Sequence, residues 1–112
     1  MQRQNSHNDL KIKLLHSSLI NTDIGLTYFN NNKPLYLKIL FSFTQRYEDL
    51  NLNNLEEEEL ERTLHTLKGL TLTLGMEPLT QSINTLEKEI SEQTLLPFKQ
   101  LLKKTLNLII KL

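Results

Sequence analysis

Residues 60–74 read LERTLHTLKGLTLTL, and this stretch decides the class of fold. Its leucines and one threonine recur at steps of three and four residues, which is the repeat of one face of an α-helix. The members of this apolar stripe are Leu60, Leu64, Leu67, Thr71 and Leu74. Glutamates at 56–59 precede the stripe, where the positive end of a helix dipole favours negative charge. The sequence therefore predicts a helix here, with Asn54 as its N-cap and Glu57 completing a capping box.

Three other long segments carry the same helical repeat. Their apolar faces are formed by Tyr36, Leu40, Phe43, Tyr47 and Leu50 in the first segment, by Leu79, Ile83, Leu86 and Ile90 in the second, and by Phe98, Leu101, Leu102, Thr105, Ile109 and Leu112 in the third. Because proline suits the first turn of a helix, we expect Pro34 to begin the first segment. We expect Pro97 in the first turn of the last helix, with Thr94 as its cap. Gly75 and Pro78 bracket a tight turn.

A shorter helix is predicted between Asn21 and Asn32, with Asn21 or Thr22 as its cap. Amphipathic segments joined by short turns predict an all-α protein, an antiparallel up-down four-helix bundle with an additional short N-terminal helix. This domain is expected to span residues 21–112, and residues 1–20 are expected to be a linker or a frayed helix. The composition agrees, since 26 of the 112 residues are leucine and none is the strand-favouring valine.

Charge and composition exclude several classes of protein. The 13 basic and 13 acidic residues cancel, whereas a nucleic-acid binder normally carries a basic excess. The chain has no cysteine, which removes disulfides, thiolate metal sites and cysteine nucleophiles. No apolar run is long enough to span a bilayer or to act as a secretory signal. We therefore expect a monomeric, cytoplasmic protein that neither binds nucleic acid nor inserts into a membrane.

The outward face of the helix over residues 60–74 carries a histidine. On a wheel of about 100° per residue, His65 lies roughly 140° from the centre of the leucine stripe. Lys68 and Gly69 share its face, and so does Leu72 one turn further on. A neutral imidazole is a nucleophile near pH 7, and an ammonium one turn away can pair with an anion attached to it. Gly69 costs the helix about 1 kcal/mol relative to alanine, which close approach by another molecule would offset.

Together these residues describe a histidine that accepts a phosphoryl group from a docked partner. An exposed Leu72 beside a glycine offers an apolar contact surface to a partner protein. We therefore assign Leu72 to partner binding, together with Arg62. If the turn of the helical hairpin centres near residue 76, His65 faces Glu87. A carboxylate there is expected to accept a hydrogen bond from one ring nitrogen and to leave the other free to react.

These residues resemble the signature of the histidine-containing phosphotransfer (HPt) domain of multistep two-component phosphorelays. The matching segments are His65-Thr66-Leu67-Lys68-Gly69, Leu74-Gly75 and Leu86-Glu87, with Gly25-Leu26, Phe29, Leu35-Tyr36 and Phe43 upstream. The resemblance covers about residues 21–110. One departure is that small residues usually follow the glycine, whereas this chain has Leu70-Thr71-Leu72, whose bulk is expected to narrow the choice of partner.

The resemblance implies that Nε2 of His65 takes a phosphoryl group from an aspartate of a response-regulator receiver domain and passes it to another receiver. It implies that Lys68 stabilises the phosphoryl oxygens, that Gly69 clears space for the partner and that Glu87 orients the ring. Magnesium would come from the receiver, because no carboxylate cluster at His65 suits it. The chain has no Gly-rich phosphate loop, so we expect a phosphoryl carrier and not an autonomous kinase.

The first 20 residues suggest a domain of a hybrid sensor histidine kinase, at the cytoplasmic end of a membrane-bound protein. The alternative is a non-catalytic helical interaction module in which His65 is incidental. Two residues also have purely structural readings of their own: Glu87 pairs with Lys88 or Lys68 at the surface, and Leu72 is covered by the N-terminal segment. A carboxylate-bridged di-metal bundle is disfavoured, because it needs Glu-x-x-His on two helices, whereas Glu61 and His65 are four apart and have no second copy.

Overall fold

Every regular element that the structure describes is a helix, so the prediction of an all-α protein is confirmed. The computed structural model describes residues 2–112, and the side chains of residues 7–112. The elements are α1 (Gln2–Leu15), α2 (Thr22–Tyr28), α3 (Lys33–Tyr47), the 3₁₀ turn η1 (Leu52–Asn54), α4 (Glu57–Leu74), α5 (Glu77–Lys88) and α6 (Glu92–Ile110). None of the described helices combines the length and the apolar character that crossing a lipid bilayer requires.

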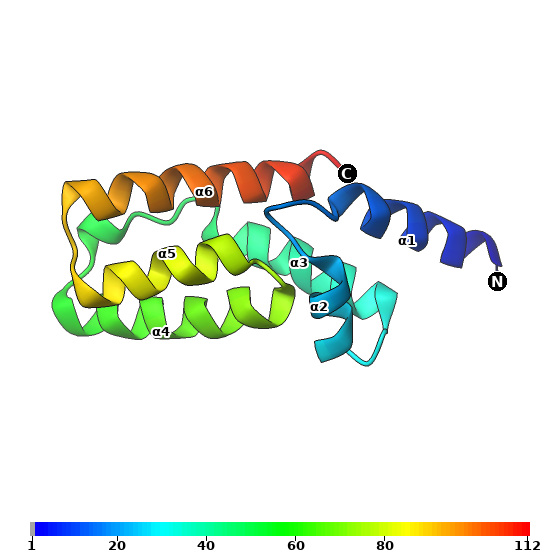
Figure 1. Ribbon diagram of the computed structural model, residues 1–112, viewed down its shortest axis with the longest axis horizontal. Helices are drawn as coiled ribbons and strands as arrows, with labels where there is room; N and C mark the ends of the chain where they lie inside the picture. The colour runs from blue at the N-terminus through cyan, green and yellow to red at the C-terminus, as the bar shows by residue number, and fades with distance from the viewer. Residues whose placement is uncertain (1) are drawn as a thin grey trace.

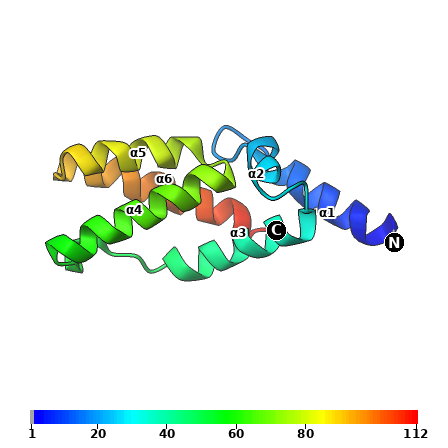
Figure 2. The same ribbon diagram turned by 90° about the horizontal axis from the view of Figure 1, so that it is seen from below.

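The helices α4, α5 and α6 lie side by side, and each runs opposite to the one before it (Figure 1). α3 packs against α6 and α1, and the short α2 packs against α4. Seen from below, α1 extends beyond the other helices at one end of an elongated molecule of 48 × 23 × 21 Å (Figure 2). The main neighbours of α4 are therefore α5 and α2.

The predicted apolar stripes form the core. In α4 the four later members of the stripe are buried and Leu60 is half-buried. The buried threonines of the hairpin are satisfied, because Thr71 Oγ1 lies 2.8 Å from Thr80 Oγ1 across the contact of α4 with α5. Among the described residues, no buried side-chain nitrogen or oxygen lacks a hydrogen-bond partner. The leucine stripe therefore sets the rotation of α4 and holds its opposite face toward solvent.

Two predicted helix caps are wrong. Asn54 belongs to η1, and the N-cap of α4 is Glu56, whose side chain makes no capping hydrogen bond. The chain turns once more before α4 because Leu52 is buried and the Asn51 side chain caps this turn. At α6 the cap is Ser91 rather than Thr94, and the two residues form a capping box.

The same shift moves Pro97 from the predicted first turn into the interior of α6. The prediction for Ile90, which was expected on the inward face of α5, is also wrong. That helix ends at Lys88, and Glu89 is extended with φ −156° and ψ 125°. Ile90 therefore lies beyond the end of the helix and does not continue its buried face, and its side chain is 46% exposed.

The segment expected to be a linker or a frayed helix contains α1. Leu10 and Leu14 are exposed at 56% and 64%, but Ile12, Leu15 and Ile20 are buried in the same core as the other helices. These three side chains anchor the end of α1 and the turn after it. The C-terminal half of this segment therefore packs on the domain that was expected to begin at residue 21.

A buried junction attaches the start of α2 and α3 to the end of α4. The Asn21 N–H donates to the Gly75 carbonyl at 2.7 Å, and the Tyr36 hydroxyl donates to the Leu74 carbonyl at 2.8 Å. Asn21 also caps α2 as predicted, accepting from the N–H groups of the first turn. Carbonyls at a helix C-terminus have no partner within the helix, so Tyr36 supplies one from α3.

We expect Tyr36→Phe to lower the free energy of unfolding by about 1–3 kcal/mol, because it leaves the buried Leu74 carbonyl without a donor. Burial raises the pKa of Tyr36, so the neutral phenol is favoured in the folded state. The stability that this shift contributes is present below pH 10, the ordinary tyrosine pKa, and is lost above it. Denaturant unfolding at pH 7 and pH 11 measures both effects. Tyr28→Phe, at a 55% exposed position, is the control and should change neither.

Candidate functional site

The outward face of α4 carries the residues singled out in the sequence. His65 is exposed, Leu72 is 51% exposed, and a Cβ built on Gly69 meets no atom within 4 Å. Because Gly69 lies in open space, tight packing inside this chain does not account for a glycine at that position. The N-terminal segment does not cover Leu72, so that reading of this one residue is wrong.

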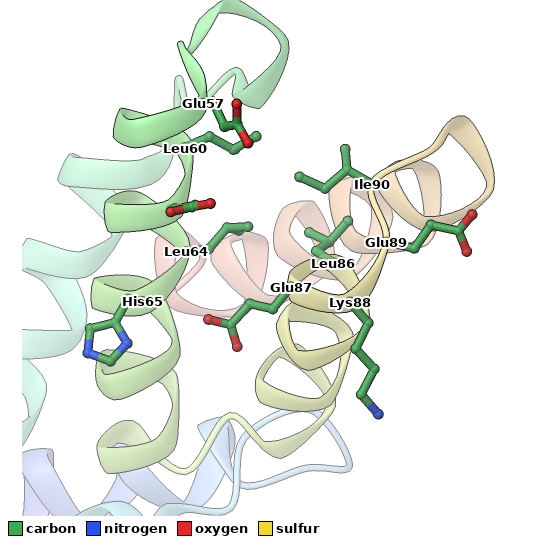
Figure 3. A pocket seen from close by; sticks show the side chains of 10 residues that line it. Glu57, Leu60, Leu64, His65, Leu86, Glu87, Lys88, Glu89 and Ile90 are labelled. Atoms are coloured by element: carbon green, nitrogen blue, oxygen red, sulfur yellow. The ribbon is translucent and has the colours of Figure 1, made fainter.

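The His65 ring makes no hydrogen bond with any of the described residues, and it stands on the outer side of α4 (Figure 3). His16 behaves differently, since its Nδ1 lies 2.9 Å from Thr22 Oγ1 and accepts from the Thr22 N–H. An imidazole with unbonded nitrogens can act as a nucleophile toward an incoming electrophile. Both ring nitrogens of His65 are therefore free of hydrogen bonds to the described residues, whereas Nδ1 of His16 is engaged by Thr22.

Lys68 and Glu87 form an ion pair across α4 and α5. The distance from Lys68 Nζ to Glu87 Oε1 is 3.1 Å, and the side chains are 41% and 31% exposed. Figure 3 shows the Glu87 carboxylate extending from α5 toward α4, and the His65 ring projecting from α4 away from that carboxylate. In this arrangement Glu87 accepts its hydrogen bond from Lys68 and not from His65, which is the surface pairing that the sequence left open.

A groove of about 550 Å³ runs between the first half of α4 and the end of α5 (Figure 3). Its floor is apolar and its rim acidic; the lining residues are Glu57, Leu60, Glu61, Leu64, His65, Leu86, Glu87, Lys88, Glu89 and Ile90. Within the described part of the chain, no three His, Asp or Glu side chains are grouped so that they could hold a metal ion. The described residues of the groove therefore do not form a metal-binding group with His65.

Arg62 is exposed one turn before His65 and borders a different groove, with Arg46 and Tyr47 of α3. It lies on α4 beside His65, as expected, but toward α3 instead of toward Glu87. The guanidinium of Arg46 lies 5.2 Å from the centre of the Tyr47 ring, and Arg62 has no acidic partner among the described residues.

The sequence reasoning missed two exposed apolar side chains on α2. Ile24 and Tyr28 are 39% and 55% exposed, while the other face of this helix is buried through Thr22, Gly25 and Leu26. The helix that carries these two side chains packs against α4. The signal in the sequence was the i, i+4 spacing of two large apolar residues on the side of the helix opposite the buried one.

Comparisons with protein-family models, with curated proteins and with solved structures found no match to this chain.

Proposed function

We propose that this chain is a phosphoryl carrier of the HPt type, with α3, α4, α5 and α6 as its antiparallel up-down four-helix bundle. It accepts a phosphoryl group on His65 from the aspartyl phosphate of one receiver domain and passes it to another. One observation carries the proposal: an exposed, unbonded imidazole stands beside an ammonium and an uncovered glycine on one helix face. The proposal places the chain in the cytoplasm, where receiver domains act.

The transfer needs positioning and charge neutralisation more than covalent machinery. The lone pair of a His65 ring nitrogen attacks phosphorus in line with the receiver carboxylate. The bond from phosphorus to the carboxylate oxygen breaks, and the carboxylate leaves with its electron pair. Magnesium bound by the receiver neutralises charge on its side, and Lys68 does so on this side.

Gly69 and the apolar residues beside it act in docking. A receiver must bring its aspartyl phosphate within bonding distance of a ring nitrogen, so its surface has to approach α4 closely. The absent side chain at Gly69 permits that approach, and the exposed Leu72 on the same helix face offers apolar contact. Ile24 and Tyr28 are further exposed apolar side chains on the neighbouring helix α2. Tyrosine, the residue at position 28, is one of the residue types that most often carry the binding energy of protein interfaces.

The test is phosphoryl transfer from receiver domains. A panel of receivers, each loaded with radioactive phosphate at its aspartate, is mixed with the chain. We expect an acid-labile, base-stable phosphate on His65 that is absent from His65→Gln and unchanged in His7→Gln. Transfer that persists in His65→Gln would contradict the proposal, and so would failure of every receiver and of a small phosphodonor to label the wild type. A helical interaction module with an incidental His65 would give the second of these results.

We expect Lys68→Ala to slow transfer by about tenfold without unfolding the domain, because it removes a charge-assisted hydrogen bond to the transferred group. The helix itself loses only an exposed pair with Glu87, which is worth at most about 1 kcal/mol. Circular dichroism on heating measures the second effect and rapid-quench kinetics the first. Lys88→Ala, at another exposed lysine of the hairpin, is the control, and a melted domain in Lys68→Ala would contradict the expectation.

A further inference from the structure

Lys68 has an anionic partner in the resting protein. Its ammonium lies 3.1 Å from a Glu87 oxygen, and that carboxylate belongs to the neighbouring helix α5. Lys68 is also three residues after His65, so its ammonium can reach a group attached to the ring. One cation therefore has two possible anions, the carboxylate on α5 and a phosphoryl group on α4.

The two anions differ in strength. A phosphoryl group carries nearly two negative charges and three acceptor oxygens, whereas a carboxylate carries one charge and two oxygens. The existing pair is about a third exposed on both sides, so solvent weakens it and leaves it easy to break. A phosphoryl group on His65 would therefore take the ammonium from Glu87.

We propose that Glu87 is a positioning residue that acts through Lys68: it holds the ammonium between α4 and α5 until the phosphoryl group displaces it. This inference rests on the proposed function. Each phosphorylation of His65 then has to break one ion pair, and each departure of the phosphoryl group restores it. Glu87 thereby slows loading and makes the phosphohistidine a better donor to the next receiver.

The experiment uses phosphoramidate, which needs no cognate receiver. The lone pair of a His65 ring nitrogen bonds to phosphorus, the phosphorus–nitrogen bond of the donor breaks, and ammonia leaves with its electron pair. The initial rate of labelling is followed by phosphorus NMR, and the site is identified by mass spectrometry. We expect Glu87→Gln to raise this rate about two- to fivefold, the range that an exposed ion pair represents.

A double-mutant cycle separates this route from simple charge repulsion. In a Lys68→Gln background, Glu87→Gln should have no effect, because the carboxylate no longer has an ammonium to hold. Glu89→Gln is the matched control, since it removes the same charge from an exposed residue of the same groove, and its rate should equal that of the wild type.

Several results would overturn the inference. Equal acceleration in Glu89→Gln, or acceleration that persists without Lys68, would indicate general electrostatic repulsion. An unchanged rate in Glu87→Gln would show that the pair does not compete, and a slower rate would indicate that Glu87 orients the imidazole instead. Absence of any label on wild-type His65, from phosphoramidate and receivers alike, is a different result and would overturn the proposed function itself.

Discussion

Gly75→Ala is expected to lower the free energy of unfolding by at least about 2 kcal/mol. Gly75 ends α4 with φ +82°, and this left-handed conformation costs any other residue about 1–2 kcal/mol. A Cβ there would lie 2.1 Å from the Asn21 carbonyl oxygen and 3.2 Å from the Gly25 nitrogen. The backbone of the α2 start must therefore move, and the hydrogen bond from Asn21 to the Gly75 carbonyl is lost with it.

Gly69→Ala provides the matched control on the same helix. Its backbone is helical and a Cβ meets nothing within 4 Å, so alanine should raise stability by about 1 kcal/mol. The two identical substitutions are thus expected to shift the melting temperature in opposite directions. Each kcal/mol corresponds to roughly 4 °C or more in a domain of this size. Equal losses at the two positions would contradict the role given to the Gly75 turn.

Gly69→Arg is expected to abolish docking while leaving the fold intact. Arginine is a good helix former and has open space at this position, so the melting temperature should not fall. Its side chain would occupy the surface that a receiver must approach beside His65. We expect receiver-dependent transfer to drop by about thirtyfold or more, which corresponds to a hot-spot loss of about 2 kcal/mol.

Two measurements show whether this loss is steric. Phosphoramidate is small enough to reach His65 past an arginine, so labelling by this donor should be retained in Gly69→Arg. Gln81→Arg adds the same side chain to an exposed position of α5 and should leave transfer from receivers unchanged. If Gly69→Arg bound and accepted phosphate from receivers like the wild type, α4 would not be the docking face.

Local periodicity was enough to predict that the chain is all-helical and which faces of the main helices are buried. The stripes of Tyr36 to Tyr47 and of Leu64 to Leu74 are buried as expected, because a 3.6-residue repeat depends only on neighbours along the chain. The helix ends were predicted less well. Asn54 and Thr94 are suitable caps by residue type, but burial of Leu52 and the capping box of Ser91 moved the starts of α4 and α6.

In the candidate site, too, the sequence predicted the exposed face of one helix but not the contact between two helices. The outward placement of His65 and Leu72 followed from the leucine stripe on α4 and is confirmed. The partner of Glu87 did not follow, because the residue across a hairpin depends on the axial register of two helices. The observed ion pair joins Glu87 to Lys68, three residues beyond His65 and less than one helical turn away.

The sequence by itself determined that the chain is helical and that an imidazole, an ammonium and a glycine share one exposed face. Tertiary structure alone decided that Lys68 is held by Glu87, that Ile90 is exposed and that α2 brings Ile24 and Tyr28 to α4. The physical reason is that a one-dimensional pattern specifies which side of each helix is buried. The rotation, register and turn geometry that bring two helices together come from packing between residues far apart in the chain.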